Sequence, residues 1–261
     1  MTLRMCVLGS GSRGNCIYVA SPEAAMLIDA GLSAKQTRLR LAMIGVEFED
    51  IDAICISHEH SDHVAGLRVI CKQTNARVYA NAGTAQALAQ SSAGLNIQWN
   101  IFSTGTPFSI ADMEILPFSL SHDAYEPVGY VISCGAMRIG VATDLGMMTT
   151  LARQRLSDCE VLVIEANHDV HLVERSNRPW SLKQRILGRQ GHLSNDCAAE
   201  AIIDCAGKRL ARVYLAHMSN ECNDCDLAKQ RIGRALASAD LQHIEVCETY
   251  PDRISTCWEA P

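Results

Sequence analysis

Short apolar runs alternate along the chain with stretches in which apolar residues recur every three or four positions. Runs of four to eight residues rich in Val, Ile and Leu, bounded by Gly, Ser or Asp, predict strands. They lie at 3–8, 16–20, 25–29, 51–57, 77–80, 114–118, 128–133, 137–142, 160–165 and 212–216. The helical periodicity predicts helices at 33–44, 64–72, 84–91, 146–153, 195–206 and 224–237.

The order of these elements is similar in the two halves of the chain. Each half begins with strands that suit hairpins and continues with strands that alternate with helices. Such alternation is typical of α/β proteins. We therefore expect one α/β domain over residues 1–261, built from two related halves that face each other.

Composition narrows the class of protein. Hydrophobic residues make up 48% and charged residues 20% of the 261 positions, which is ordinary for a globular protein and argues against disorder. The net charge of −6 excludes a surface that is basic throughout, but it leaves room for a local basic patch that binds nucleic acid. No apolar run approaches the roughly 18–20 residues of a membrane span, and no secretory signal is visible. We therefore expect a cytoplasmic protein that does not contact membranes.

The twelve cysteines are scattered along the chain. Without a secretory signal they are expected to be reduced thiols, most of them buried as small apolar residues. Cys222 and Cys225 form a C-x-x-C pair, but the sequence offers no second pair to complete a structural zinc site.

The segment ICISHEHSDH at 54–63 carries the densest group of metal-binding side chains. His58 and His60 alternate like strand residues, so both imidazoles can reach one cation from the same side. Asp62 and His63 follow where the chain turns into a helix, and they can face a second cation. Imidazole and carboxylate together suit zinc, manganese or iron better than calcium.

This segment resembles the H-x-H-x-D-H signature of the metallo-β-lactamase superfamily, and the resemblance extends over nearly the whole chain. It implies a four-layer αββα sandwich, and an aspartate, Asp29, that orients the metal loop. It also implies two divalent metal ions, zinc or manganese. The implied ligands are His58, His60 and His122 for the first ion, Asp62, His63 and His217 for the second, and Asp144 as the bridge.

Further segments distinguish the branches of the superfamily. The bridging Asp144 disfavours the β-lactamases, which lack it. The segment EANHD at 165–169 resembles the His-Glu-Ala-Thr motif of transfer-RNA 3′-processing nucleases, with Ile164 in place of the histidine, and GHLSN at 191–195 resembles their Gly-His-Ser-Thr segment. The combination is similar to the WalJ/YycJ-like group of 5′→3′ DNA exonucleases. The matching segments lie at 9–15, 121–124, 127–130, 165–169, 191–195 and 216–219.

The resemblance implies a metal-dependent phosphodiesterase or nuclease acting on DNA rather than RNA. Two cations would clamp the phosphate and lower the pKa of a water between them. Asp62, or else the bridging Asp144, would hold the proton of the attacking hydroxide, and His192, or else His168, would protonate the leaving oxygen. One alternative is a thioester or lactone hydrolase of the glyoxalase II type, which would need an apolar acyl pocket. Another is a binding protein that keeps the fold without turnover.

A basic run lies between Glu174 and His192 and contains no acid. Cations can neutralise phosphates and an indole can stack on bases, so the run predicts nucleic-acid contacts; the alternative is a solvated helical face. The predicted contacts are Arg175, Arg178, Trp180, Lys183, Arg185, Arg189, Ser194 and Asn195. The glycine-rich segment at 9–15 predicts a tight hairpin, or else backbone amides and Arg13 placed near a terminal phosphate.

Overall fold

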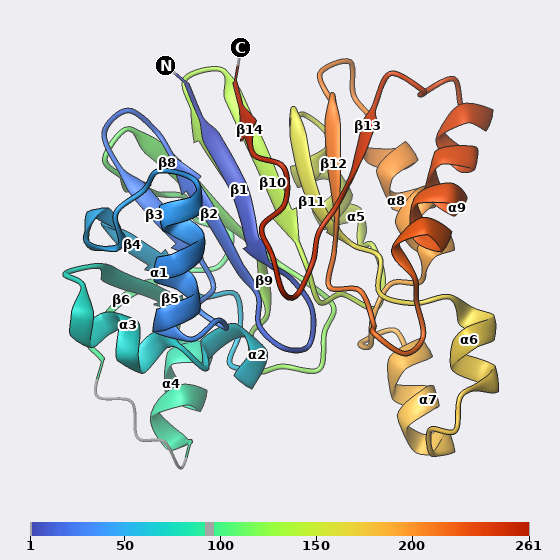
Figure 1. Ribbon diagram of the computed structural model, residues 1–261, viewed down its shortest axis with the longest axis horizontal. Coiled ribbons are helices and arrows are strands. Elements are labelled where there is room, and N and C mark those ends of the chain that lie inside the picture. The colour runs from blue at the N-terminus through green and yellow to red at the C-terminus, as the bar shows by residue number, and fades with distance from the viewer. Residues whose placement is uncertain (1, 92–96, 261) are drawn as a thin grey trace.

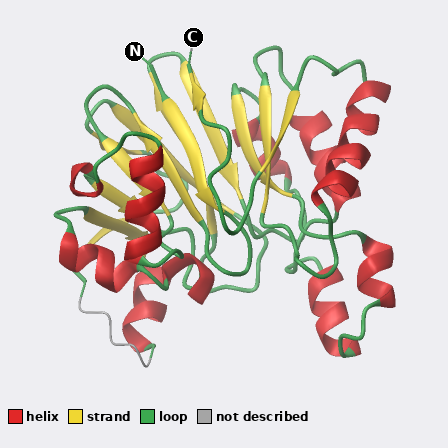
Figure 2. Cartoon of the chain, viewed as in Figure 1, coloured by secondary structure: helices red, strands yellow, loops and turns green. Residues whose placement is uncertain are grey.

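The computed structural model describes residues 2–91 and 97–260, in which two sheets of seven strands each lie face to face (Figures 1 and 2). The first sheet has the order β14-β1-β2-β3-β4-β5-β6. Its strands are β1 (Arg4–Gly9), β2 (Cys16–Ala20), β3 (Ala25–Ile28), β4 (Ala53–Cys55), β5 (Arg77–Asn81), β6 (Trp99–Phe102) and β14 (Trp258–Glu259).

The second sheet has the order β13-β12-β11-β10-β9-β8-β7. Its strands are β7 (Phe108–Ile110), β8 (Met113–Ser119), β9 (Val128–Cys134), β10 (Met137–Ala142), β11 (Val161–Glu165), β12 (Arg212–Ala216) and β13 (Glu245–Glu248). In each sheet, antiparallel pairing on one side gives way to parallel pairing on the other. The two halves of the chain thus build similar sheets, as the repeated order of elements predicts.

Helices cover the outer faces of both sheets (Figure 1). The first sheet packs against α1 (Ala34–Met43), α3 (Leu67–Gln73) and α4 (Ala82–Gln90), and the second against α5 (Thr150–Leu156), α8 (Asn195–Cys205) and α9 (Cys225–Ser238). The strands bury both faces. In β1, Met5 and Val7 lie between the sheets while Cys6 and Leu8 face the helices, because successive side chains point to opposite sides. This arrangement confirms the predicted αββα sandwich.

Two predicted helices differ from the structure. The expected helix at 64–72 is divided into α2 (Ser61–Val64) and α3, and Gly66 lies at the break, where a Cβ would stand 1.8 Å from the Leu32 carbonyl oxygen. The expected helix at 146–153 begins only at Thr150, capped by Thr149, because Gly146 packs tightly against the backbone of residues 188–191. The N-cap predicted at Ser33 is confirmed by its bond from the Gln36 amide.

The chain adds short elements that its pattern did not predict. A 3₁₀ turn, η1, spans Phe48–Asp50. Helices α6 (Val170–Arg175) and α7 (Trp180–Leu187) form what we call the basic lobe, residues 170–189, which lies below α8 and α9 at the right of Figure 1. Among the helices of residues 2–91 and 97–260, none has the length and apolar character needed to cross a bilayer.

Candidate metal centre

The predicted metal ligands and Asp29 lie just beyond the carboxyl ends of strands, in loops that meet next to α2 in Figure 1. Asp29 follows β3 and Asp144 follows β10, while His217 follows β12. All three have a left-handed backbone, with φ of 62°, 60° and 53°. Asp and His tolerate this conformation better than most residues, and such strain is common at functional sites. It turns the chain sharply out of each strand at the residue that carries the functional group.

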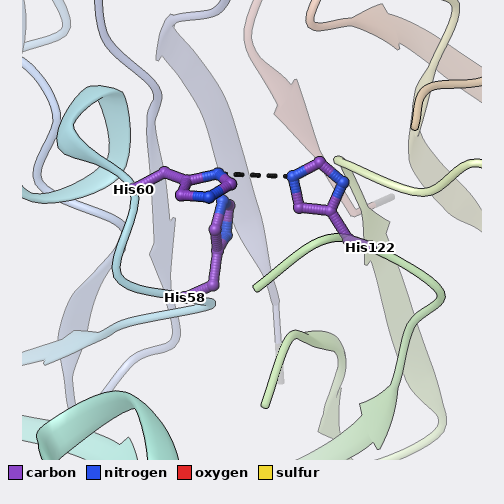
Figure 3. A group of neighbouring side chains, drawn as sticks. All are labelled: His58, His60 and His122. Atoms are coloured by element: carbon purple, nitrogen blue, oxygen red, sulfur yellow. Dashed lines mark hydrogen bonds between the residues drawn. The ribbon is translucent and has the colours of Figure 1, made fainter. Parts of the chain in front are cut away.

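Three histidines from two different loops form the first group (Figure 3). His60 Nδ1 lies 3.3 Å from His122 Nε2, and the His58 ring stands edge-on to both neighbours. His58 Nε2 is buried and has no hydrogen-bond partner in the described parts of the chain. Three imidazole nitrogens that converge with an unpartnered one among them are suited to a metal ion.

Asp62, His63 and His217 form the second group. Asp62 Oδ2 lies 3.1 Å from His217 Nε2 and 3.6 Å from His63 Nε2. Asp144 stands between the groups, with Oδ2 3.1 Å from His63 Nε2 and Oδ1 3.8 Å from His122 Nε2. Its Oδ2 is buried and has no hydrogen-bond donor among the described residues. The structure therefore brings together all seven residues that the sequence pointed to as ligands.

Asp29 orients His63 by binding Nδ1, the ring nitrogen that points away from the other metal-binding side chains. Its Oδ2 lies 2.7 Å from His63 Nδ1, and its two oxygens accept bonds from the backbone and hydroxyl of Ser57. A carboxylate on the outer nitrogen leaves the other nitrogen of the ring free for a metal. This geometry supports the role expected of Asp29.

Glu165 is a functional residue that the sequence reasoning missed. It is fully buried at the end of β11, and its Oε1 lies 2.9 Å from His217 Nδ1 and 2.8 Å from His192 Nδ1. Its Oε2 accepts the backbone amides of Leu145 and Leu193. One carboxylate thus holds two rings of the site. One feature of the sequence could have revealed it. Glu165 ends a strand that lies between the strands followed by Asp144 and His217.

Asn15 was missed as well. Its side-chain nitrogen lies 3.0 Å from His63 Nε2 and donates to Asp62 Oδ2, and its oxygen accepts from Gly11 N. The glycine-rich segment is the predicted tight hairpin between β1 and β2, with Asn15 as its link to the metal loop. Arg13 is exposed in this hairpin.

The electrostatics of the cluster favour a cation. Burial alone would lower the pKa of His63, but Asp144 and Asp29 raise it to about 10. Burial likewise opposes a charge on His217, whose pKa Asp144 and Asp62 nevertheless raise well above its usual value. By contrast, burial lowers the pKa of His58 well below its usual value. The buried carboxylates are stabilised by positive charge, which a divalent ion would supply. Zinc and manganese both bind donor sets made of imidazoles and carboxylates. The residues therefore fit the divalent metal site that the signature implies.

His192 and His168, the two candidate proton donors, lie in different surroundings. His192 is partly exposed beside the cluster; burial lowers its pKa, but the bond to Glu165 outweighs this and raises it. His168 is only 1% exposed, and burial lowers its pKa to about 4. Of the two candidate donors, His192 is therefore the one that lies partly exposed beside the metal-binding side chains.

The predicted nucleic-acid contacts at Ser194 and Asn195 are wrong. Both residues are buried at the start of α8. Ser194 caps the helix by accepting from Cys197 N, and Asn195 exchanges side-chain bonds with Asn223. Their polar groups are used inside the fold, which the sequence pattern alone did not reveal.

The other basic-run residues lie on or beside α6 and α7. Trp180 is 67% exposed, and Arg175 and Arg189 are exposed without an ion pair in the described residues. Arg178 binds Glu221 at 2.9 Å, and Arg185 is paired with Asp123. The run contains no acid in sequence, but in the folded protein two of its arginines form ion pairs with acids from other parts of the chain. Lys183 reaches the Glu174 carbonyl oxygen.

Gly31 holds the loop after β3 against the metal loop, and Gly31→Ala is expected to destabilise the protein. An added Cβ would stand 1.7 Å from the Asp62 carbonyl oxygen and 2.6 Å from Asn15 N, both backbone atoms. Such overpacking costs about 1–3 kcal/mol or more. Thermal unfolding should show a Tm lower by several degrees.

Gly233→Ala is the matched control. Gly233 lies inside α9 with nothing within 4 Å of an added Cβ. Alanine there should stabilise the helix by about 0.5–1 kcal/mol. Equal shifts in Tm for the two variants would contradict the close approach at Gly31.

Comparisons with known proteins agree with this geometry. The chain matches the family described as the beta-lactamase superfamily domain over residues 25–218. It is 38% identical over 252 residues to exodeoxyribonuclease WalJ of Streptococcus pneumoniae, covering 94% of each chain. It is 35% identical over 237 residues to exodeoxyribonuclease YycJ of Bacillus anthracis, covering 90% of each.

Solved structures share the fold at low identity. The metallo-beta-lactamase fold protein YhfI from Bacillus subtilis has a TM-score of 0.75 and 15% identity, covering all of both chains. The Zn²⁺-bound PqqB from Methylobacterium extorquens has a TM-score of 0.69 and 16% identity, covering 98% of this chain and 99% of that one. An αββα sandwich with histidines and aspartates gathered at its strand ends defines a metal-dependent hydrolase. The chain belongs to the metallo-β-lactamase superfamily, and within it to the family of WalJ and YycJ.

Proposed function

We propose that the protein is a metal-dependent exonuclease that hydrolyses phosphodiester bonds of DNA in the 5′→3′ direction. The relatives at 35–38% identity, both called exodeoxyribonucleases, cover at least 90% of the chain. The observation that carries the proposal is that a chain with this sequence similarity also has a full set of metal-binding side chains beside a basic lobe.

The proposed centre holds two divalent ions, zinc or manganese. The first is held by His58, His60 and His122, the second by Asp62, His63 and His217, with Asp144 between them. When bound, the ions supply Lewis acidity that polarises the scissile phosphate and activates water.

The protein's own groups divide the remaining work. Asp62 uses Oδ2 toward His217, which leaves Oδ1 to accept the proton of the attacking water. Glu165 occupies His192 Nδ1, so Nε2 is the nitrogen that can donate to the departing 3′-oxygen. The same carboxylate keeps the His192 ring in a fixed orientation.

The basic lobe is the proposed docking surface for the DNA strand. Arg175 and Arg189 offer charge to phosphates, and the exposed Trp180 ring offers a face on which a base can stack. Lys183, Arg178 and Arg185 lie on or next to the same two helices.

A thioester or lactone hydrolase is not favoured. Such an enzyme would need an apolar acyl pocket at the centre. The cavity beside His192 is instead lined mainly by arginine, serine and asparagine, with Leu182 and Ile186 as its apolar part.

A gel assay on end-labelled DNA and RNA tests the function. Protein stripped of metal by chelation should be inactive. Added Mn²⁺ or Zn²⁺ should restore stepwise shortening of DNA from the 5′ end and much weaker action on RNA. Hydrolysis of a thioester with no action on either polynucleotide would contradict the proposal.

Charge reversal at Arg175 and Arg189 is expected to weaken DNA binding and flatten its salt dependence. Each lost phosphate contact removes about 0.7 from the slope of log K against log salt for a single strand. The double variant R175E/R189E should therefore lose about 1–2 from this slope, measured by fluorescence anisotropy. Its rate on bis-p-nitrophenyl phosphate, too small to reach the lobe, should change little.

The control is the double reversal of Lys208 and Arg234. Both residues are exposed without ion pairs in the described residues. Lys208 precedes β12, at the end of the strand away from the metal centre, and Arg234 lies on α9. If this variant lost as much of the slope as R175E/R189E, net charge rather than the basic lobe would govern binding.

A further inference from the structure

A small polar cavity adjoins the metal centre at His192. Its volume is about 150 Å³, and its polar lining comes from Ser12, Asn167, Arg178, Arg185, His192 and Ser219. A cavity of about this size holds a benzene-sized group. A phosphate group fits such a space, whereas a nucleoside is too large for it.

The polar groups that line the cavity are suited to an anion. They are two guanidinium groups, two hydroxyls, an amide and an imidazole, and no carboxylate is among the lining residues. All of these groups can donate hydrogen bonds, and guanidinium groups match the geometry of phosphate oxygens. A neutral or cationic ligand would leave several of these donors without acceptors.

Both arginines form ion pairs with acids outside the cavity, and each still has N–H groups free to bind a ligand. Arg178 uses Nε and Nη2 on one carboxylate oxygen of Glu221, and Arg185 uses Nε on Asp123. A guanidinium has five N–H groups, so Nη1 of Arg178 and both terminal nitrogens of Arg185 remain for a ligand. The two acids orient the forks and do not line the cavity.

The cavity is tied to the metal centre through short bonds. Ser12 lies in the hairpin between β1 and β2, where Ser10 Oγ accepts the amide of His217. Asn167 donates to the His217 carbonyl oxygen at 2.7 Å, and its own carbonyl oxygen accepts the amide of Ser219. These hydrogen bonds therefore fix the distance between the cavity and the metal-binding side chains.

We propose that this cavity binds the terminal phosphomonoester of the DNA strand, so that the enzyme measures its cut from the strand end. This inference rests on the proposed nuclease function and deepens it. A terminal phosphate carries a second negative charge that an internal phosphodiester lacks. Two arginines therefore bind the terminal phosphate more strongly. The chemistry is the same for a 5′- and a 3′-phosphate, and the substrates below separate the two.

The test compares one single-stranded oligonucleotide with a 5′-phosphate, a 3′-phosphate or hydroxyls at both ends, and a circular form without ends. Charge-assisted bonds from two arginines predict a kcat/KM about 10–100-fold higher for one of the phosphorylated ends. The circle should resist. Fluorescence anisotropy in EDTA, with metal-free protein and the same linear strands, should show tighter binding of the same phosphorylated end.

Arg178→Met and Ser12→Ala should bring the ratio between phosphorylated and hydroxyl ends close to one. Both side chains are at the surface, and the Glu221 carboxylate that Arg178 leaves behind is well solvated, so folding is expected to survive. Arg175→Met is the matched control, because Arg175 belongs to the same lobe but does not line the cavity. It should change both rates alike and keep the ratio.

Equal rates and equal binding for all linear ends would overturn the proposal, even if DNA is hydrolysed and the nuclease function stands. A wild-type ratio that persists in Arg178→Met would overturn it too. If no DNA is hydrolysed, the nuclease function fails. Binding in EDTA still decides then, since a preference for one phosphorylated end that Arg178→Met abolishes supports the cavity as a phosphate site.

Discussion

Asp144→Ala protein is expected to lose at least one of the two proposed metal ions and most of its activity on DNA. Asp144 is buried between the two histidine groups, and one of its oxygens has no hydrogen-bond donor in the described residues. Without this carboxylate, histidines remain but nothing joins the two groups. The fall in kcat should exceed the roughly 10–100-fold that loss of a residue merely orienting a ligand costs.

Metal content by mass spectrometry, after dialysis against trace metal, measures this effect. Asp158→Ala is a suitable control, because Asp158 is exposed and forms a surface pair with Arg138. It should keep both ions. Retention of both ions by the Asp144→Ala protein would exclude Asp144 as the bridge.

His192→Ala is expected to lower the rate on DNA by roughly 10²–10⁴, the usual contribution of a general acid. Its Nδ1 is held by Glu165, and it is absent from the proposed ligands, so metal content should stay intact. A substrate that releases p-nitrophenolate needs no proton on its leaving group and should be largely spared. Rates on both substrates at saturating metal measure the effect.

His243→Ala provides the control, since His243 is an exposed histidine in the turn before β13, outside the basic lobe. It should leave both rates near those of the wild type. If His192→Ala slowed both substrates equally, the residue would serve to hold the start of α8 rather than to donate a proton.

Local patterns were enough to predict the parts of the site that depend on spacing. His58 and His60 alternate as strand residues do, and Asp62 and His63 begin a helix, so neighbours in sequence become neighbours in space. His122, Asp144 and His217 were implied by the resemblance to the superfamily, and each follows an apolar strand, where α/β folds gather functional groups. The alternation of strands and helices predicted an α/β domain with two related halves, while the αββα sandwich was implied by the resemblance to the metallo-β-lactamase superfamily.

Other features depend on partners far away in the chain. The Glu165 carboxylate holds His217 and His192, and Arg185 meets Asp123 across 62 residues. Strand β14 was not predicted, and it pairs with β1 from the opposite end of the chain. None of these pairings leaves a periodic signal in the sequence.

The amino-acid sequence by itself predicted the strands that lead into the site, most of the larger helices and the metal-binding signature, but it did not predict β6, β7, β13 or β14. Only the tertiary structure decided that Ser194 and Asn195 are buried, that His168 is shielded while His192 is partly exposed, and that the hairpin and the basic lobe enclose one cavity. The physical reason is that periodicity reports which face of an element is buried. Which side chains then share a hydrogen bond or a cavity is settled by how the packed layers bring distant loops together.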